Sequence, residues 1–302
     1  MRHFIDLDQI DKKELQKILQ VAKSLKAKKS NAKLNGKNLA MIFEKTSTRT
    51  RVSFEVAINQ LGGHAIVMNQ KDMQLGKGET IGDTAQVLSR FVDAIMIRSN
   101  SHQTILELAA NSTIPVINAL SDFSHPCQIM ASIMAIEEHI GSVKGKILAW
   151  FGDANNVLNS YIHAASAFGY ELQIAVPKNY NFCDIEIKKA QKNGAKISKF
   201  SVAKDAAKGA DVLIADTWFS MGDAAEKDKK LHDKKLKEMM PYQVNQGLMK
   251  IANKNAIFTH CLPAYRGYEV TAEVIDGKKS IVFDEAENRL HAQKAILLWC
   301  MQ

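Results

Sequence analysis

The chain has 302 residues, of which 46% are hydrophobic and 24% are charged, a composition typical of soluble globular proteins rather than disordered or fibrous ones. This length exceeds one typical core, so we expect one large domain or two ordinary ones. The lysines behind the formal net charge of +8 are spread along helical segments with acidic residues among them, as in KDKKLHDKKLKEM, which favours a solvated surface over a nucleic-acid-binding stripe.

Segments that would direct the chain to a membrane or out of the cell are not evident. No apolar run approaches the roughly 20 residues that span a bilayer, and the N-terminal MRHFIDLDQIDKKELQ lacks the features of a secretory signal. We therefore expect a cytoplasmic protein. The cysteines Cys127, Cys183, Cys261 and Cys300 are widely separated and form no C-x-x-C pair, which argues against a zinc site and a disulfide framework.

The first half of the chain alternates between helical and strand patterns. DKKELQKILQVAKSLKAKK predicts an amphipathic helix with Asp11 as its N-cap and Glu14 three residues later. Strand KNLAMIFE, helix TRVSFEVAINQLGG and strand HAIVMN then form a βαβ unit, which implies a parallel sheet. The alternation continues with helices DTAQVLSRF and TILELAAN and strands DAIMIRS and IPVINA.

After the helix HPCQIMASIMAIEEHIG the pattern restarts with strand KILAWFGD, helix NNVLNSYIHAASAFG and strand YELQIAVP. Further predicted strands are DVLIADTW, NAIFTHCLP and SIVFDE, and the last predicted helix is RLHAQKAILLWC. The sequence thus predicts two α/β halves, each a doubly wound parallel sheet, joined near residues 135–145.

The segment FEKTSTRTRVSFE places cations and hydroxyl groups between a predicted strand and helix. The N-terminus of a helix offers unpaired backbone N–H groups to an anion. Ser47, Thr48 and Thr50 add hydroxyl donors, and Arg49 adds a planar fork that matches phosphate oxygens. The alternative is that Ser47 or Thr48 only caps the helix while the arginines are solvated.

Two more polar positions follow predicted strands in the first half. Arg98 comes directly after DAIMI, where parallel sheets collect ligands, although a lone arginine there is often a surface residue. His125 and Gln128, in HPCQ, could hold a carbonyl group, or His125 could simply cap the helix in which Pro126 suits the first turn.

Three loops carry the polar side chains of the second half. GDANN lacks the G-x-G-x-x-G of dinucleotide sites, so its amides suit a small zwitterion better than a nucleotide. In ADTWFSMGD, Asp216 and the turn at Ser220 could hold an amino acid, or this could be an ordinary polar loop. For Cys261, in THCLPAYRG, no base that would activate the thiol is apparent from the sequence, so we reject a covalent cysteine mechanism.

Taken together, these motifs resemble one family, the aspartate/ornithine carbamoyltransferases. STRTR and HPCQ are shared features of its carbamoyl phosphate site, and DTWFSMG and HCLPAYRG resemble the ornithine branch. The aspartate enzymes lack the Ser-Met-Gly loop, and enzymes acting on putrescine or acetylornithine differ there. The resemblance runs from FEKTSTRTR to ENRLHAQKAIL and implies an enzyme that converts ornithine and carbamoyl phosphate to citrulline and phosphate, most simply in arginine biosynthesis.

The resemblance also implies roles for individual residues. The carbamoyl phosphate site would comprise Ser47, Thr48, Arg49, Thr50, Gln74, Arg98, His125, Pro126, Cys127, Gln128, Cys261, Leu262 and Arg289. The ornithine site would comprise Asn156, Asp216, Ser220 and Met221. Arg98, His125 and Cys261 would act in catalysis, with Cys261 and Leu262 between the substrates.

No metal or organic cofactor is expected. We expect a carbamoyl phosphate domain at 1–138, completed by the helix 287–302, and an ornithine domain at 139–286. The resemblance implies a homotrimer in which Gln74 enters a neighbouring subunit's site. Two other classes remain open at this point: a non-catalytic protein that binds a phosphorylated metabolite, and a nucleic-acid binder, which the lack of interleaved aromatic residues disfavours.

Overall fold

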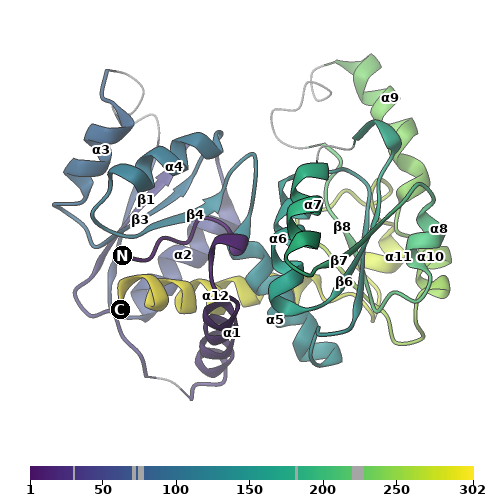
Figure 1. Cartoon of the computed structure of the whole chain (residues 1–302), viewed down its shortest axis with the longest axis horizontal. Helices are drawn as coiled ribbons and strands as arrows, with labels where there is room; N and C mark the ends of the chain where they lie inside the picture. Colours follow the sequence, from purple (N-terminus) through teal and green to yellow (C-terminus); the bar gives the residue numbers. More distant parts are fainter. Residues whose placement is uncertain (30, 70–72, 74–77, 181–182, 220–227) are drawn as a thin grey trace. The chain divides into compact units, whose positions relative to one another are not determined.

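The computed structural model describes residues 1–29, 31–69, 73, 78–180, 183–219 and 228–302 (Figure 1). They divide into two compact units. The first unit comprises Met1–Met134 with Glu287–Gln302, and the second unit comprises Ala135–Ala286. In the part of the chain that is described, no helix is both long and apolar enough to cross a membrane.

The first unit contains a four-stranded parallel sheet in the order β2-β1-β3-β4. Its strands are β1 (Asn38–Phe43), β2 (His64–Asn69), β3 (Ala94–Arg98) and β4 (Val116–Leu120). Its helices include η1 (Leu7–Gln9), α1 (Lys12–Lys26), α2 (Thr48–Gln60), α3 (Ile81–Leu88) and α4 (His102–Asn111). The helices α5 (Pro126–Ile140) and α12 (Val282–Met301) contribute residues to both units.

Successive residues of the central strands point to opposite faces of this sheet, and both faces are buried. Ala40 and Ile42 of β1 and Ile95 of β3 pack in one apolar cluster with Ile105 of α4 and Ala85 of α3. The intervening strand residues are also fully buried. Burial on both faces is the pattern expected for a parallel sheet covered by helices, which explains the near-continuous apolar runs in these strands.

The second unit contains a five-stranded parallel sheet in the order β7-β6-β5-β8-β9. Its strands are β5 (Ile147–Phe151), β6 (Glu171–Ala175), β7 (Lys196–Phe200), β8 (Val212–Ala215) and β9 (Ile257–Thr259). Its helices include α6 (Asn156–Phe168), η3 (Lys178–Tyr180), α7 (Asp184–Lys192), α8 (Ala203–Ala207), α9 (Lys229–Met239), η5 (Met240–Tyr242), α10 (Gln246–Ile251) and α11 (Ala272–Ile275).

Helices cover both faces of this second sheet. On one face, Phe151 and Leu213 pack in a cluster with Leu248 of α10. On the other face, Trp150 lies against Tyr161 of α6, with ring centroids 6.0 Å apart. The prediction of two doubly wound parallel-sheet halves is therefore confirmed.

One predicted strand is wrong. SIVFDE was expected as a strand, but helix α12 begins at Val282, and only Ser280 makes an isolated bridge, to Phe258. A short apolar run cannot be assigned to strand or helix by periodicity alone. Here Asp284 and Glu285 lie in the first turn of α12, where negative charge stabilises a helix.

One strand was missed altogether. β7 has the sequence KISKF and lies at the edge of its sheet, where its two lysines are exposed. Lysine is common on edge strands because it discourages pairing with another chain. The same lysines obscure the apolar pattern from which a strand is predicted.

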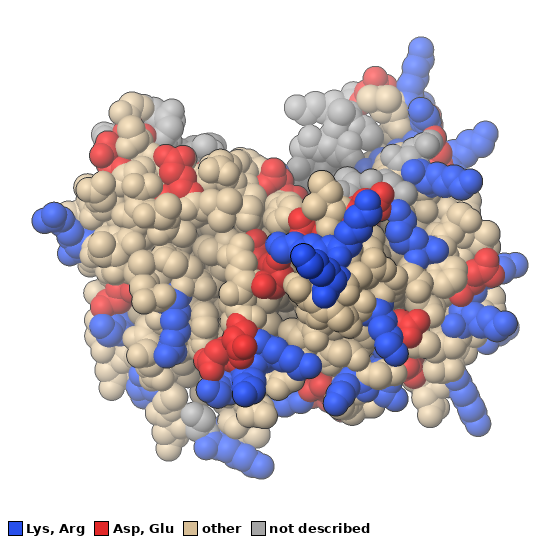
Figure 2. Space-filling model, in the orientation of Figure 1, with Lys and Arg blue, Asp and Glu red and all other residues tan. Residues whose placement is uncertain are grey.

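Charges of both signs are dispersed over the surface. On the described part of the face shown in Figure 2, Lys and Arg side chains lie among Asp and Glu side chains and do not form a stripe of one sign. This distribution favours a solvated surface as the explanation of the net charge of +8.

The backbone at Gly152, directly after β5, leaves no room for a side chain. Gly152 has φ +109°, and an added Cβ would overlap the indole Nε1 of Trp218. We expect Gly152→Ala to lower the free energy of unfolding by about 2–4 kcal/mol, because backbone strain adds to overpacking. The measurement is urea unfolding followed by circular dichroism.

Gly141 provides the matched control. It also has a positive φ, +75°, but nothing lies within 4 Å of an added Cβ. Gly141→Ala should therefore cost only the backbone strain, about 1–2 kcal/mol. Equal losses in the two variants would show that the contact with Trp218 is unimportant.

Candidate active site

The first cluster of polar residues lies where the strand order of the first unit reverses. The chain passes from β1 to β2 on one side and then returns to β3 on the other side of β1. In such sheets, ligands bind outside the carboxyl ends of the two strands at the reversal. The end of β1 leads to Ser47, and β3 ends at Arg98.

Hydrogen bonds join these two strand ends. Nη1 of Arg98 donates to Oγ of Ser47 at 3.3 Å and to Oγ1 of Thr50 at 3.5 Å. Ser47 is also the N-cap of α2, since its Oγ accepts from the backbone N–H of Thr50. Capping and anion binding are thus compatible, because the remaining N–H groups of the first turn still point out of the helix. Thr48 and Arg49 in this turn are exposed.

A buried arginine links this turn to the HPCQ segment. Arg289 of α12 is 4% exposed. Its Nη2 donates to Oγ1 of Thr50 and its Nη1 donates to Oε1 of Gln128, both at 2.7 Å. A guanidinium group can make such a bridge because its planar fork carries donors in fixed directions.

His125 is buried close to the arginines of the first unit. Burial holds the pKa of the His125 imidazole well below its ordinary value, and the positive charges of Arg289, Arg98 and Arg49 lower it further. Both causes disfavour the charged form of a histidine. His125 is therefore neutral at physiological pH.

The side chains of Pro126 and Cys127, which follow His125, stabilise the local structure. Pro126 is the first residue of α5, as predicted for a proline at the first helical position. The Cys127 thiol donates to the carbonyl oxygen of Asn118 at 3.3 Å, and burial raises its pKa to about 12. The Cys127 side chain is therefore a neutral, buried thiol.

Sequence reasoning missed the residues that support the turn before His125. His102 lies with Nε2 3.1 Å from Oδ2 of Asp6 and with Nδ1 2.9 Å from Oγ of Ser121. The Ser121 Oγ accepts from the backbone N–H groups of Phe123 and Ser124. These residues are far apart in the sequence, so no local pattern could have predicted their contact.

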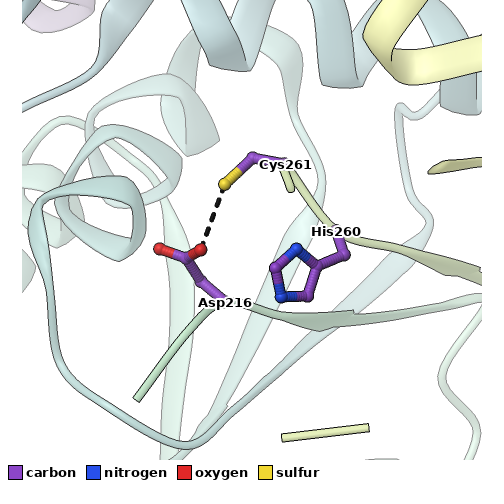
Figure 3. A group of neighbouring side chains, drawn as sticks. All are labelled: Asp216, His260 and Cys261. Atoms are coloured by element: carbon purple, nitrogen blue, oxygen red, sulfur yellow. Dashed lines mark hydrogen bonds between the residues drawn. The ribbon is translucent and has the colours of Figure 1, made fainter. Parts of the chain in front are cut away.

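The second cluster lies at the strand reversal of the second unit, between β5 and β8. Asp216 follows β8 and is 5% exposed. Its Oδ2 accepts from Nδ2 of Asn155 at 2.7 Å, and its Oδ1 accepts from Sγ of Cys261 at 3.1 Å. Figure 3 shows the Cys261 and Asp216 side chains pointing toward one another, with the His260 ring beside them.

Asn155 is a residue that the predicted site omits. Asn156 was predicted to bind ornithine and is the half-buried first residue of α6. Asn155 is the N-cap of the same helix, and its Oδ1 accepts from the backbone N–H groups of Val157 and Leu158. Cap geometry fixes the Asn155 amide so that its nitrogen points to Asp216.

The two carboxylates Asp153 and Asp216 differ in their partners. Asp153 is paired with Lys235, at 3.0 Å from Oδ2 to Nζ. Within the part of the chain that the structure describes, Asp216 has no cationic partner and is held by neutral donors only. Burial of a carboxylate without a counter-charge is costly, so a cationic ligand beside Asp216 would be favourable.

Asp216, His260 and Cys261 are residue types that bind zinc, and their donor atoms lie within 4.8 Å of one another. The hydrogen bonds do not suit a preformed metal centre, however. Nδ1 of His260 accepts from the backbone N–H of Leu262 at 2.8 Å, and its Nε2 lies 3.3 Å from Oε1 of Glu269. The thiol and the carboxylate are hydrogen-bonded to each other.

The predicted site residues thus fall into two groups. Within the first unit, hydrogen bonds or charge interactions bring together Ser47, Arg49, Thr50, Arg98, His125, Gln128 and Arg289. Within the second unit, Asp216 and Cys261 are in contact, and Leu262 follows them in the loop after β9. Gln74, Ser220 and Met221 lie outside the described residues.

Comparison with known proteins matches both halves of the chain to one family. Residues 2–138 match the family model of the aspartate/ornithine carbamoyltransferase carbamoyl-P binding domain, and residues 144–300 match that of the Asp/Orn binding domain. The chain is 55% identical over 305 residues to an ornithine carbamoyltransferase of Rhodopseudomonas palustris, covering 99% of this chain and 96% of that protein.

Solved structures of similar proteins lead to the same family. An ornithine carbamoyltransferase from Pyrococcus furiosus is 46% identical, with a TM-score of 0.92 and coverage of 99% of this chain and 97% of that one. An anabolic ornithine carbamoyltransferase from Campylobacter jejuni is 43% identical, with a TM-score of 0.91 and coverage of 98% of each chain. With both halves matched by their family models, the chain belongs to the aspartate/ornithine carbamoyltransferase family.

Proposed function

We propose that this protein transfers the carbamoyl group of carbamoyl phosphate to the side-chain amine of L-ornithine, with release of L-citrulline and phosphate. The observation that carries the proposal is the opposite charge of the two strand-reversal sites. The first unit gathers Arg49, Arg98 and Arg289 around a hydroxyl-rich helix N-terminus. The second unit presents Asp216, a buried carboxylate. A phosphate suits the first site, and an ammonium group suits the second.

Carbamoyl phosphate is assigned to the first unit. Its phosphate binds to the backbone N–H groups at the start of α2, to the hydroxyl groups of Ser47, Thr48 and Thr50, and to Arg49. Arg98, already hydrogen-bonded to this turn, faces the carbamoyl oxygen together with His125. The proposed carbamoyl phosphate domain comprises residues 1–138 with 287–302, and the contact of Arg289 with this turn supports the inclusion of the C-terminal helix.

The chemistry requires a neutral amine and stabilisation of an oxyanion. The side-chain amine of ornithine has a lysine-like pKa of about 10.4 and must lose its proton before its lone pair attacks the carbamoyl carbon. Negative charge then develops on the carbamoyl oxygen, where donors fixed in advance are most effective. As the bond between carbon and the phosphate oxygen breaks, the phosphate leaves with the electron pair and takes up the second proton that the attacking nitrogen gives up. Arg49 stabilises the charge of the departing phosphate.

Ornithine is assigned to the second unit, residues 139–286. Asp216 binds an amino group, and Asn156, Ser220 and Met221 complete the site for the α-amino and carboxylate groups. Asn155 orients Asp216 through their hydrogen bond. Cys261 acts as a hydrogen-bonding thiol that donates to Asp216, not as a covalent nucleophile.

The central test is a citrulline assay with L-ornithine, putrescine and acetylornithine side by side, each with carbamoyl phosphate. We expect turnover with L-ornithine and little with the other two amines. Binding of carbamoyl phosphate without product from any amine would instead identify a non-catalytic binding protein. Inactivity with L-ornithine and activity with another amine would overturn the substrate assignment.

The two halves of the site should be separable by substitution. Asp216→Ala should raise the ornithine KM strongly while carbamoyl phosphate still binds to the free protein, as measured by calorimetry. The assignment of Asp216 fails if its replacement abolishes carbamoyl phosphate binding in a folded protein.

Arg98→Met should weaken carbamoyl phosphate binding and slow turnover, with a combined cost of about 2–4 kcal/mol for a lost charge-assisted contact.

The neutral state of His125 predicts a dependence of stability on pH. Its pKa is lowered in the folded protein, whereas the unfolded chain binds a proton near the ordinary value of about 6.5. The unfolded state therefore binds more protons below that pH, so the contribution of His125 to stability is lost as the pH falls through about 6.5.

Urea unfolding of the wild type and of His125→Asn at about pH 8 and about pH 5, on either side of the ordinary histidine pKa, measures this effect. We expect the wild type to lose more stability than the variant between the two conditions. His3 and His291, whose pKa values are also lowered, are common to both proteins and cancel in the difference. An equal loss would mean that His125 is charged in the folded protein.

We further propose that the protein acts in the cytoplasm, in arginine biosynthesis, as a homotrimer. The anabolic designation of the Campylobacter jejuni relative supports the biosynthetic direction. In a closed ring of subunits, each subunit can give a loop to one neighbour and receive a loop from the other. Gln74 is assigned to such a loop, on the family resemblance of its sequence MQLGKGET.

A mixing experiment tests the shared site. An inactive Arg49→Met variant and an inactive Gln74→Ala variant are dissociated, mixed in equal amounts and reassembled. Random mixing around the ring should restore about a quarter of all sites, because a site needs Arg49 from one subunit and Gln74 from its neighbour. If mass spectrometry verifies exchange and citrulline formation stays absent, Gln74 does not act between subunits.

A further inference from the structure

Glu269 and His260 form a fully buried pair that the proposed ligand contacts do not use. Glu269 is 0% exposed and His260 is 1% exposed, and Nε2 of His260 lies 3.3 Å from Oε1 of Glu269. Removing a carboxylate from water costs several kcal/mol even in real proteins. Such a group is expected to have a specific role.

The hydrogen bonds of His260 fix its tautomer. Nδ1 accepts from the backbone N–H of Leu262 at 2.8 Å, so it carries no proton. The ring proton is therefore on Nε2, the nitrogen that faces Glu269. A second proton on Nδ1 would abolish the contact with Leu262. The Glu269 carboxylate thus lies beside the ring nitrogen opposite the one that holds the backbone of Leu262.

Glu269 is itself well anchored and contacts the same loop a second time. Its backbone carbonyl accepts from the N–H of Val244, a fully buried residue, at 2.9 Å. Its Oε1 accepts from the backbone N–H of Tyr265 at 2.6 Å. One carboxylate oxygen therefore contacts both sides of the turn between Cys261 and Tyr265, directly at Tyr265 and through His260 at Leu262.

The turn needs such support because Leu262 has a left-handed backbone, with φ +57°. This conformation costs a residue with a side chain about 1–2 kcal/mol. It persists only where the surrounding structure enforces it, and residues held in this way cluster at functional sites. Leu262 directly follows Cys261, whose thiol donates to Asp216.

We propose that Glu269 is a positioning residue: acting through His260, it holds Leu262 in its left-handed conformation and so keeps the Cys261 thiol on Asp216. Glu269 itself touches no substrate. The expected effect on turnover rests on the proposed function, whereas the expected effect on the Cys261 thiol does not.

The reactivity of Cys261 with iodoacetamide measures the state of this turn. Cys261 is half-exposed, whereas Cys127, Cys183 and Cys300 are buried and burial raises the pKa of each of their thiols. Neutral, buried thiols react slowly. Alkylation followed by peptide mass spectrometry therefore reports mainly on Cys261.

Glu269→Leu removes both contacts of Oε1, so it should release the turn. We expect Cys261 to be alkylated about tenfold faster than in the wild type, a change equivalent to about 1.4 kcal/mol. In the citrulline assay, we expect kcat to fall more than carbamoyl phosphate affinity. Glu269→Gln keeps an oxygen at the position of Oε1 and should retain slow alkylation and most of the activity.

Two controls separate positioning from general destabilisation. Glu186 contacts another buried histidine of the second unit, His163, at 3.0 Å from Oε2 to Nε2. Glu186→Leu should lower stability without accelerating the alkylation of Cys261. In a Leu262→Gly background, Glu269→Leu should have a much smaller effect on alkylation than in the wild type, because glycine adopts a positive φ without strain.

The proposal is overturned if Glu269→Leu leaves Cys261 alkylation unchanged, or if its effect is the same in the Leu262→Gly background. If Glu269→Leu does not fold, Glu269→Asp replaces it, since the shorter side chain withdraws the carboxylate from His260, and the same expectations apply. A wild type that makes no citrulline would disprove the proposed function, while the alkylation experiments would still decide the role of Glu269.

Discussion

The arrangement of both sites depends on one constraint of parallel sheets, the reversal of strand order. Where two neighbouring strands are followed by connections that leave in opposite directions, their carboxyl ends are not covered by either connection. In this chain the reversal lies between β1 and β3 in the first unit and between β5 and β8 in the second. Ser47, Arg98, Asn155 and Asp216 all follow these strands or end them, so the same rule places the polar residues of each unit at one edge of its sheet.

The two sites differ in the charges of their buried groups and in the groups that surround them. In the first unit, Arg289 and Arg98 share the hydroxyl oxygen of Thr50, and their charges help to keep His125 neutral. A cluster of cations with a neutral imidazole is suited to an anion whose charge moves during the reaction. In the second unit, Asp216 is held by neutral donors, so its own negative charge is available to a ligand.

The predictable part of the fold and site is the part that depends on local pattern. Strands such as KNLAMIFE and DVLIADTW are apolar runs followed by polar loops, and a polar residue at the end of a strand could be assigned from that position alone. SIVFDE was assigned wrongly because its apolar run is too short to distinguish a strand from the first turn of α12. His102 and Glu269 could not be found from the sequence, because each acts through residues that only the tertiary fold brings close.

The position of Arg289 in the chain has a consequence for biosynthesis. The second unit is continuous from Ala135 to Ala286, whereas the first unit is interrupted by it. Domains made on the ribosome generally fold in the order in which they emerge. Here Arg289 emerges only after the whole second unit, so its hydrogen bonds to Thr50 and Gln128 form late. Until then Thr50 and Gln128 lack the guanidinium group that joins them, and the second unit is the first of the two that can complete its own fold.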